Sequence, residues 1–532
     1  MIAVRDAFQL AVLNIGELGD TDVFPLPVEN HVLHDMPDET VAILSDIHDH
    51  FDDRLAANGP VNESALAMVG YTSFRWATQI DPIWNAYFLG LVLSLADDIE
   101  GARLPTNDER VFSYRYQPDS ETKRLFSEGA WTAFQTSSAN RAREATHVVA
   151  CDIGDFYARI YHHRLENALQ TVAPGSDIPH RILKLLSNFS VNTSYGLPVG
   201  GPAARILSEL LLNRVDRLLV VEGVDFARFV DDYYLFVNSP GEAYDALLTL
   251  SDLLIRNEGL TLQRAKTRIM SGEEFLASSI FAPEGASAVD PTSRRFLTLS
   301  LRYDPYSTTA VEDFETLRQQ VEEFDIGGML TREIQKSRIS TSLTRRLLQA
   351  LRFTDPAQRA QIALSLVDSL ENLAPVFTSV MRALREMSGE LPIEATIEIV
   401  SKLRALIESG SHLAKIDVNL AYMIPVIAAH QTEENEALLS QIFERDVAAF
   451  VKRDVILVMA SWGATYWLSD KKTRYAAMHA WVKRAFVIAS YGLGDEGQHW
   501  RRAVRPSLAP FDELCRAWME ARVNTAGWRF PL

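Results

Sequence analysis

Two adjacent aspartates, Asp231 and Asp232, lie between two short apolar runs, and this pattern restricts the fold of the chain more than any other feature. The preceding run VDFARFV and the following run YYLFV have the length and the β-branched and aromatic content of strands. The sequence therefore predicts a strand, a tight turn and a strand between Gly223 and Val237, with both carboxylates at the tip. Because Asp-Asp is also a common turn dipeptide, this hairpin alone does not establish a chemical role.

A third aspartate, Asp152, follows the run HVVAC at residues 147–151, which predicts a buried strand. Taken alone, an Asp at this position is more often a helix N-cap than a ligand. Together, one Asp after a strand and two at a hairpin tip form the set that two metal ions about 3.5 to 4 Å apart need for phosphoryl transfer. The carbonyl of Ile153 can share a cation with them. Clustered carboxylates need a cation to neutralise them, and hard oxygen ligands select Mg²⁺ or Mn²⁺.

Outside these strands the chain is expected to be mostly helical. Residues 60–100 have helical spacing, and WNAYFLGLVLSLADDIE (residues 84–100) predicts one mostly buried helix. Beyond about residue 310 strand signals vanish, and amphipathic helices follow, for example with apolar residues at Ile393, Ile397, Val400, Leu403 and Ile407. Successive helices of this kind favour a HEAT-like solenoid, although no consensus repeat is present. The expected fold class is α+β, with one domain at residues 1–305 and an all-α domain at residues 306–532.

Charge and hydropathy restrict the possible partners. A net charge of -18 argues against a surface that coats duplex nucleic acid, because phosphate binding requires Lys and Arg. The longest apolar run, at residues 86–96, is too short to cross a bilayer, so we expect a cytoplasmic protein without membrane contact. Two basic stretches could meet phosphate, although solvated helix faces explain either one equally well. They are Arg110, Arg115, Lys123, Arg124, Arg141 and Arg143, and then Arg332, Lys336, Arg338, Arg345, Arg346 and Arg352.

The order and spacing of the carboxylates resemble motifs A and C of reverse transcriptases, with Phe229-Val230-Asp231-Asp232 in place of the aromatic-x-Asp-Asp box. The resemblance covers four motifs over residues 110–275: residues 192–212 (NTSYGLPVGGPAARILSELLL) are similar to motif B, and residues 258–270 to motif D. It implies a palm and fingers core, and two Mg²⁺ or Mn²⁺ ions per active site, held by Asp152, Ile153, Asp231 and Asp232.

The resemblance also implies roles for individual residues. Tyr157 takes the place of the steric gate that excludes a ribose 2'-hydroxyl, so dNTPs are the implied substrates. Lys266 takes the place of the lysine that protonates the departing pyrophosphate. Val199 departs from the family, since many members have Gln there, and this departure argues against conventional template-directed selection. The implied dNTP-binding residues are Ile153, Phe156, Tyr157, Arg115, Lys123, Arg124, Pro198, Val199 and Gly200.

Longer phrases narrow the resemblance. FSYRYQPD, SYGLPVGGPAARILSELLLNRVD and LRYDPYS, joined to a helical domain where a thumb would otherwise lie, resemble bacterial abortive-infection (Abi) and defence-associated reverse transcriptases, of the Abi-P2 or AbiK type. This likeness implies antiphage defence, a homo-oligomer (trimer or hexamer), and template-independent DNA synthesis. It also implies that a tyrosine of the chain is the primer, so that the single-stranded DNA product is covalently attached to the protein.

Three other interpretations compete with this one. A templated enzyme of the retron or intron type should carry a basic thumb, which the acidic helical part does not supply. A non-catalytic helical scaffold with a relic palm is disfavoured by the joint presence of Asp152, Asp231, Asp232, Tyr157 and Lys266. The third interpretation, a palm-fold nucleotide cyclase, does not explain the motif B segment.

Overall fold

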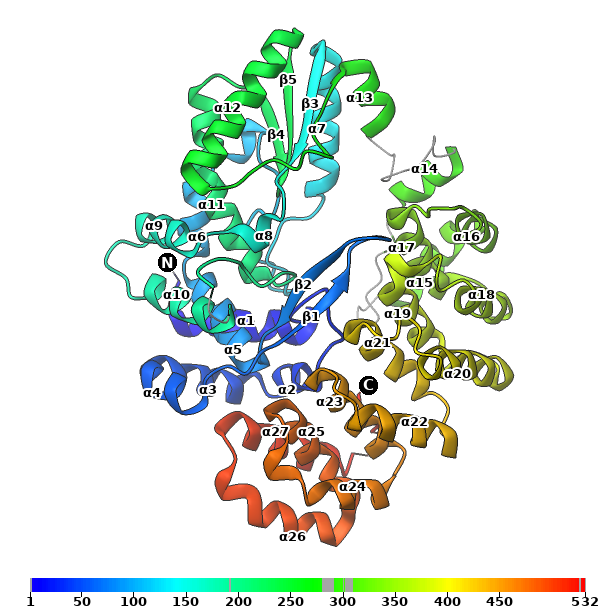
Figure 1. Cartoon of the computed structure of the whole chain (residues 1–532). Helices are drawn as coiled ribbons and strands as arrows, with labels where there is room; N and C mark the ends of the chain where they lie inside the picture. Colours follow the sequence, from blue (N-terminus) through cyan, green and yellow to red (C-terminus); the bar gives the residue numbers. More distant parts are fainter. Residues whose placement is uncertain are drawn as a thin grey trace. The chain divides into compact units, whose positions relative to one another are not determined.

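The computed structural model describes residues 2–190, 193–279, 291–299, 301, 310–525 and 528–531, which form a mostly helical α+β fold. Contacts divide the chain into two compact units (Figure 1). Unit 1 comprises Met1–Glu63, Thr78–Ile280 and Val504–Arg522, and unit 2 comprises Ser64–Ala77, Phe281–Ala503 and Val523–Leu532. The expected boundary at residue 305 lies outside the described residues, so the division into residues 1–305 and 306–532 stays a prediction.

Unit 1 is built on a four-stranded antiparallel sheet with the order β4-β5-β3-β6. The predicted strand and hairpin are both present, as β3 and as β4 with β5. Alternate side chains face opposite helices: Phe134 of α7 stacks on Tyr234, while the Tyr233 hydroxyl bonds to Asp216 of α11. The strands are β3 (His147–Asp152), β4 (Phe226–Phe229), β5 (Asp232–Val237) and β6 (Arg268–Ser271).

Helices cover both faces of this sheet. Figure 1 shows the strands between α7 and α12, and both helices contact β5. The helices of unit 1 up to the sheet are α1 (Val4–Leu18), α2 (Val28–Asp35), α3 (Pro37–Asp49), α4 (Phe51–Asn58), α5 (Pro82–Ser94), α6 (Ala96–Ala102) and α7 (Ala130–Glu144). Those that follow are α8 (Phe156–Arg159), α9 (His162–Val172), α10 (Ile178–Phe189), α11 (Pro202–Val221), α12 (Pro240–Glu258) and α13 (Gly272–Ser279).

The expectation of continuous helix over residues 60–100 is wrong in two places. Residues 63–79 form a hairpin of β1 (Glu63–Met68) and β2 (Phe74–Gln79), because alternation of small buried and large exposed side chains suits a strand pair. The apolar stretch that follows is two helices, since α5 ends at Ser94 and α6 begins at Ala96. Helix α5 starts at a cap in which the Asp81 side chain accepts from the Ile83 N–H.

The last helix, α27 (Pro510–Arg522), belongs to unit 1 and packs against α2 and α3. The Trp518 Nε1 donates to Asp35 Oδ2 at 2.6 Å, and Arg522 pairs with the same oxygen at 2.6 Å. The Trp518 indole is almost fully buried. A segment near the end of the chain therefore completes the packing of its N-terminal helices.

Unit 2 contains residues 64–77, which form most of the β1–β2 hairpin, together with helices, and no strand occurs between residues 310 and 525. Helices α17, α19, α21, α23 and α25 contact one another in succession, while α18, α20 and α22 pack beside them. The helices of unit 2 are α14 (Pro291–Thr298), α15 (Ala310–Glu322), α16 (Ile326–Ile334), α17 (Thr341–Ala350), α18 (Pro356–Asp368), α19 (Phe377–Met387), α20 (Ile393–Glu408), α21 (Asp417–Ile427), α22 (Glu433–Glu444), α23 (Ala449–Ser461), α24 (Thr465–Lys472), α25 (Ala480–Ala489) and α26 (Gly494–Val504).

The buried face of α20 differs from the expected one. Val400, Leu403 and Ile407 are buried as predicted, but Ile393 and Ile397 are exposed. The face turns because Thr396 and Ile399 take the inward positions in the first turns of the helix. None of the helices among the described residues is long and apolar enough to span a bilayer.

Candidate active site

The carboxylates predicted from the sequence come from neighbouring backbone positions at one end of the sheet. Asp152 is the last residue of β3 and pairs directly with Asp232, the first residue of β5. Side chains opposite each other in an antiparallel pair share a face, with Cβ atoms about 4.5 to 5.5 Å apart. The Ile153 N–H donates to the Asp231 carbonyl at 3.1 Å, which extends this pairing into the turn. Strand pairing thus places Asp152, Asp231 and Asp232 together.

The turn that carries Asp231 is held in a strained conformation. Val230 has a φ of 58°, in the left-handed region, where a β-branched residue is an outlier. Its N–H donates to Ser113 Oγ at 2.9 Å, and its carbonyl accepts from Arg228 Nη1 at 2.8 Å. Because both backbone groups of Val230 are bonded to side chains, the surroundings fix the turn and with it the two aspartates.

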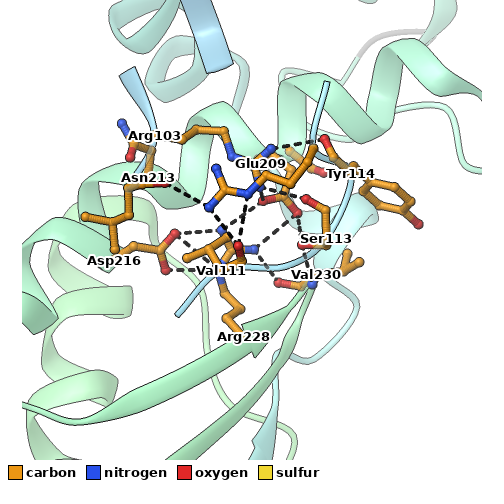
Figure 2. A network of polar contacts seen from close by, with 12 residues as sticks. Arg103, Val111, Ser113, Tyr114, Glu209, Asn213, Asp216, Arg228 and Val230 are labelled. Atoms are coloured by element: carbon orange, nitrogen blue, oxygen red, sulfur yellow. Dashed lines mark hydrogen bonds and ion pairs between the residues drawn. The ribbon is translucent and has the colours of Figure 1, made fainter. Parts of the chain in front are cut away.

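These side chains belong to a buried polar network beneath the turn (Figure 2). The Arg228 guanidinium has no solvent exposure and lies between the carboxylates of Asp216 and Glu209, at 2.6 and 2.9 Å from Nη2. Glu209 also accepts from Arg103 Nη2 at 2.6 Å and from the Ser113 hydroxyl. Paired, hydrogen-bonded charges are the form in which buried ionic groups are tolerated.

Neighbouring charges and burial shift the pKa values of the ionisable groups in this network. Burial favours a raised pKa for the Glu209 carboxyl, but Arg228 and Arg103 outweigh it and lower that pKa below its usual value. For Asp216, burial dominates and raises the pKa despite Arg228. The Arg228 pKa stays well above its usual value, since the two carboxylates outweigh burial. We conclude that Arg228 and Glu209 form the charged centre of the network.

The negative charge at the turn is only partly neutralised. Burial, and then the charge of Asp152, raise the pKa of Asp231 to about 6. Lys266, in the turn before β6, places its Nζ 3.1 Å from Asp152 Oδ2. The structure therefore brings the motif D lysine to the motif A aspartate, although 114 residues separate them in the sequence.

The donors at this turn fit a hard divalent cation. They are carboxylate oxygens with a neighbouring backbone carbonyl, and the raised Asp231 pKa indicates negative charge that a cation would neutralise. Among the described residues, however, no three or more His, Cys, Asp or Glu side chains are grouped so that they could hold a metal ion. The ligand set of Asp152, Ile153, Asp231 and Asp232 therefore stays a prediction.

The residues that follow Asp152 are buried beside the motif B loop. Ile153 and Phe156 are buried, and Tyr157 is half-buried with its hydroxyl 3.4 Å from Ser208 Oγ. Burial raises the Tyr157 pKa well above its usual value. The Tyr157 carbonyl accepts from the Leu197 N–H at 2.8 Å. The predicted gate residue is thus bonded to both the loop and the helix of the motif B segment.

The motif B loop lies against the N-terminal segment, which the sequence did not indicate. Gly200 has a φ of 103°, and a Cβ atom there would lie 2.6 Å from Thr21 Oγ1 and from Asp22 Oδ1, so Gly is required. Pro198 and Val199 line a small cavity together with Asp20, Gln79 and other residues of unit 1. Of this segment, Val191 and Asn192 lie outside the described residues.

The three cations expected to grip a triphosphate have other partners. The Arg115 guanidinium is buried and donates to the carbonyls of Val111 and Leu104 and to Glu100. Lys123 donates to the Ser120 carbonyl, and Arg124 pairs with Glu128. Phosphate contacts by these residues would require the bonds to open, and their role stays a prediction.

Sequence reasoning missed the network of Arg228, Glu209 and Ser113. A signal existed, because Arg228 and Glu209 each interrupt an apolar run, FARFV and ILSELLL. A charged residue in a buried element needs a partner. The sequence does not say which one, since Arg103 and Glu209 are 106 residues apart.

Comparison with known proteins identifies the part of the chain that holds this site. Residues 102–301 match the family described as reverse transcriptase (RNA-dependent DNA polymerase), so this stretch is a reverse transcriptase domain. None of the curated proteins compared with the chain matches it.

Two solved structures show a more distant likeness. A telomerase from Candida albicans, in complex with a TWJ fragment of telomeric RNA, is 10% identical over 76% of this chain and 70% of its own, with a TM-score of 0.31. Apo telomerase from Candida tropicalis is 10% identical over 78% of this chain and 72% of its own, with a TM-score of 0.30. Likenesses at this level say nothing about the activity of this chain.

Proposed function

We propose that this chain is a reverse-transcriptase-like DNA polymerase that adds dNTPs at Asp152, Asp231 and Asp232. The proposal rests on strand pairing within the reverse transcriptase domain, which sets Asp152 opposite Asp232, with Asp231 next to it in the turn and Lys266 on Asp152. Asp231 and Asp232 come from one turn and Asp152 from the neighbouring strand. Three such carboxylates are the donors that a two-metal phosphoryl transfer needs.

In this proposal Asp152, Ile153, Asp231 and Asp232 hold two Mg²⁺ or Mn²⁺ ions. When bound, the ions supply an activated attacking hydroxyl and neutralise the charge on the leaving pyrophosphate. Lys266 then holds a proton within reach of that charge, and Tyr157 limits the space at the sugar, which favours deoxynucleotides. The network of Arg228 and Ser113 keeps the aspartate turn in one conformation.

We further propose template-independent, protein-primed synthesis that leaves single-stranded DNA covalently attached to the chain, in antiphage defence. Support comes from the sequence likeness to abortive-infection reverse transcriptases and from Val199, an apolar residue in the motif B loop. The helices of unit 2 would form the HEAT-like domain of a homo-oligomer, a trimer or hexamer. The candidate primers are tyrosines in the linker after residue 300 and in turns of the helical part, namely Tyr303, Tyr306, Tyr466 and Tyr491. Tyr303 and Tyr306 lie outside the described residues, the Tyr466 hydroxyl bonds to Glu436, and the Tyr491 ring lies under the Arg501 guanidinium.

A conventional RNA-templated enzyme is the second candidate. It is favoured by the family match over residues 102–301, whose description names RNA-dependent DNA polymerases. The two candidates share the same carboxylates and metals, and they differ in what must be added before DNA is made.

One experiment tests the proposal and separates the two candidates. The purified chain is incubated with labelled dNTPs and Mg²⁺ or Mn²⁺, without template or primer, and run on a denaturing gel before and after nuclease. Protein-primed, template-independent synthesis predicts that labelled DNA migrates with the protein and that nuclease shortens this DNA. Incorporation only after RNA template and primer are added supports the second candidate. Equal incorporation by Asp232→Asn and wild type would contradict both.

A further inference from the structure

The β1–β2 hairpin exposes an apolar face that no part of the function proposed above uses. Phe74 and Trp76 alternate with other residues on β2, and Leu66 is on β1, with exposed fractions of 52%, 63% and 48%. Side chains two apart on a strand share a face. The opposite face is buried and is formed by small residues, Ala65, Ala67 and Ala77. Two exposed aromatic rings therefore lie next to each other on one face of this hairpin.

The hairpin is anchored at its tip within unit 2. The Tyr71 hydroxyl accepts from the Ile339 N–H at 3.0 Å and donates to the Asn372 carbonyl at 2.9 Å. The strands close with a bond from the Val69 N–H to the Ser73 carbonyl at 2.9 Å. The aromatic face is thus presented by a fixed element.

A basic segment adjoins the hairpin, although the chain as a whole has a net charge of -18. Residues 64–77 contain no acidic residue and one cation, the exposed Arg75, which alternates with Phe74 and Trp76 along β2 and so belongs to the opposite face. Residues 335–354, which include Ile339, contain five Lys and Arg residues and no acidic residue. Arg346 and Arg352 donate to backbone carbonyls and Lys336 pairs with Glu333, while Arg338, next to the anchoring Ile339, is exposed. The Tyr71 bond joins these two acid-free segments.

We propose that this aromatic face and the adjoining cations bind single-stranded nucleic acid, with bases stacked on Trp76 and Phe74. Single strands present unpaired base faces together with phosphates, so they match aromatic rings flanked by Lys and Arg, whereas a duplex hides its base faces. A second copy of this acidic chain is the competing occupant, and the measurement of oligomeric mass described below separates it from a single strand. The inference rests on the proposed function, because a DNA polymerase must hold a single strand.

Binding is measured by fluorescence anisotropy with a labelled oligodeoxythymidylate in a metal chelator without dNTPs, so that catalysis does not contribute. Stacking on one aromatic ring contributes roughly five- to one-hundred-fold to affinity. We expect Trp76→Ala to weaken binding by about that factor, and Trp76→Phe to restore most of it. Arg338→Ala should lower the salt dependence of binding by about 0.7 in the log–log slope. A duplex of equal length should bind more weakly than the single strand.

Matched controls separate this surface from the polymerase site and from general unfolding. Tyr244→Ala removes an equally exposed aromatic ring from α12 and should leave Kd unchanged. Asp232→Asn should stop incorporation but keep single-strand binding, so a failed polymerase proposal and a failed surface proposal give different results. Wild type that does not bind the oligonucleotide, or Trp76→Ala that binds like wild type, overturns the inference. A change in oligomeric mass without loss of DNA binding assigns the face to a protein interface and also overturns it.

Discussion

The Asp231 carboxyl allows the candidate site to be tested without any substrate. Burial, followed by Asp152, raises its pKa to about 6, whereas an Asp in an unfolded chain titrates near about 3.9. The folded state therefore binds more protons between these pH values. Its contribution to the free energy of unfolding is present below the unfolded pKa and is lost as the pH rises through about 6. We expect Asp231→Asn to be more stable than wild type at pH 8 in a chelator, by at most ~3 kcal/mol, and equal to it at pH 4.

Calorimetry at the two pH values checks this expectation. Mg²⁺ should reduce the difference in the free energy of unfolding between Asp231→Asn and wild type at the higher pH, because a cation neutralises the ionised carboxylate. Asp155→Asn is the matched control, since the Asp155 carboxylate is exposed. Wild type as stable as Asp231→Asn at the higher pH would show that Asp231 is an ordinary solvated acid.

A second prediction concerns the strained residue beside it. Removing the Ser113 hydroxyl leaves the Val230 N–H without its acceptor, at a cost of about 1–3 kcal/mol, and lets the turn relax. Ser113→Ala should therefore raise the Mg²⁺ concentration needed for half-maximal incorporation by about tenfold, as expected for a loss of ~1.4 kcal/mol. Glycine adopts a positive φ without strain, so adding Val230→Gly to the Ser113→Ala variant should recover part of that loss.

The double-mutant comparison decides whether the hydroxyl positions the turn or only stabilises the fold. A positioning role predicts rescue of the Mg²⁺ dependence by Val230→Gly while the melting temperature stays low. If the two substitutions raise the Mg²⁺ concentration for half-maximal incorporation additively, the strain at Val230 has no role in function.

The site residues that were predictable from the sequence are those fixed by local pattern. Asp152 follows a run of strand residues, and Asp231 and Asp232 separate two such runs, so strand periodicity alone located them. The partners of Arg228 and the role of Ser113 were not predictable, because they depend on residues brought close only by the folded chain. The triphosphate assignment of Arg115 came from the resemblance to reverse transcriptases, and the structure shows that guanidinium in bonds to buried carbonyls.

Among the elements, those with strong periodicity and a single buried face were predicted best. Steps of three and four between Phe377, Val380, Leu384 and Met387 predict an amphipathic helix, and all four are buried in α19. The β1–β2 hairpin was taken for helix, because its exposed face is apolar and so lacks the apolar–polar alternation of a strand. Helix α27 has an ordinary amphipathic sequence, and nothing in it indicates that it packs on α2 and α3.

Helix α27 gives a prediction about the stability of unit 1. Trp518 fills a buried position against the N-terminal helices and bonds to Asp35. Trp518→Ala should reduce the free energy of unfolding by about 3–5 kcal/mol, since a large cavity results and Asp35 loses one of its hydrogen-bond donors. Urea denaturation followed by circular dichroism measures the loss. Val523→Ala, at an exposed position just after the helix, is the control and should change little.

The opposite result for Trp518→Ala would contradict this role of α27. Full stability in Trp518→Ala would mean that α27 does not hold the N-terminal helices in solution. A chain ending before residue 504 should then fold unit 1 normally, whereas our expectation is that it exposes α2 and α3 and aggregates.

For the whole molecule, the uneven charge distribution matters more than the net charge. The chain has a net charge of -18, yet residues 335–354 carry five cations without an acid. An acidic surface with a limited basic segment suits an enzyme that holds a short single strand better than one that encloses a long duplex. This distribution agrees with the proposed template-independent activity and with the aromatic face of the β1–β2 hairpin.

The proposed homo-oligomer can be tested at one exposed face of unit 2. Ile393 and Ile397, exposed by 55% and 43%, lie one turn apart on α20 and form an apolar stripe. Symmetric oligomers bury the same surface patch of each copy, and such a stripe is a suitable patch. Ile397→Asp puts a charge into it, so we expect the mass measured by light scattering at micromolar concentration to fall to that of a monomer. Leu248→Asp, on the exposed face of α12 in unit 1, is the matched control and should keep the wild-type mass. If Leu248→Asp dissociates the assembly and Ile397→Asp does not, the copies meet through unit 1. A monomeric wild type with full activity would refute the oligomer itself.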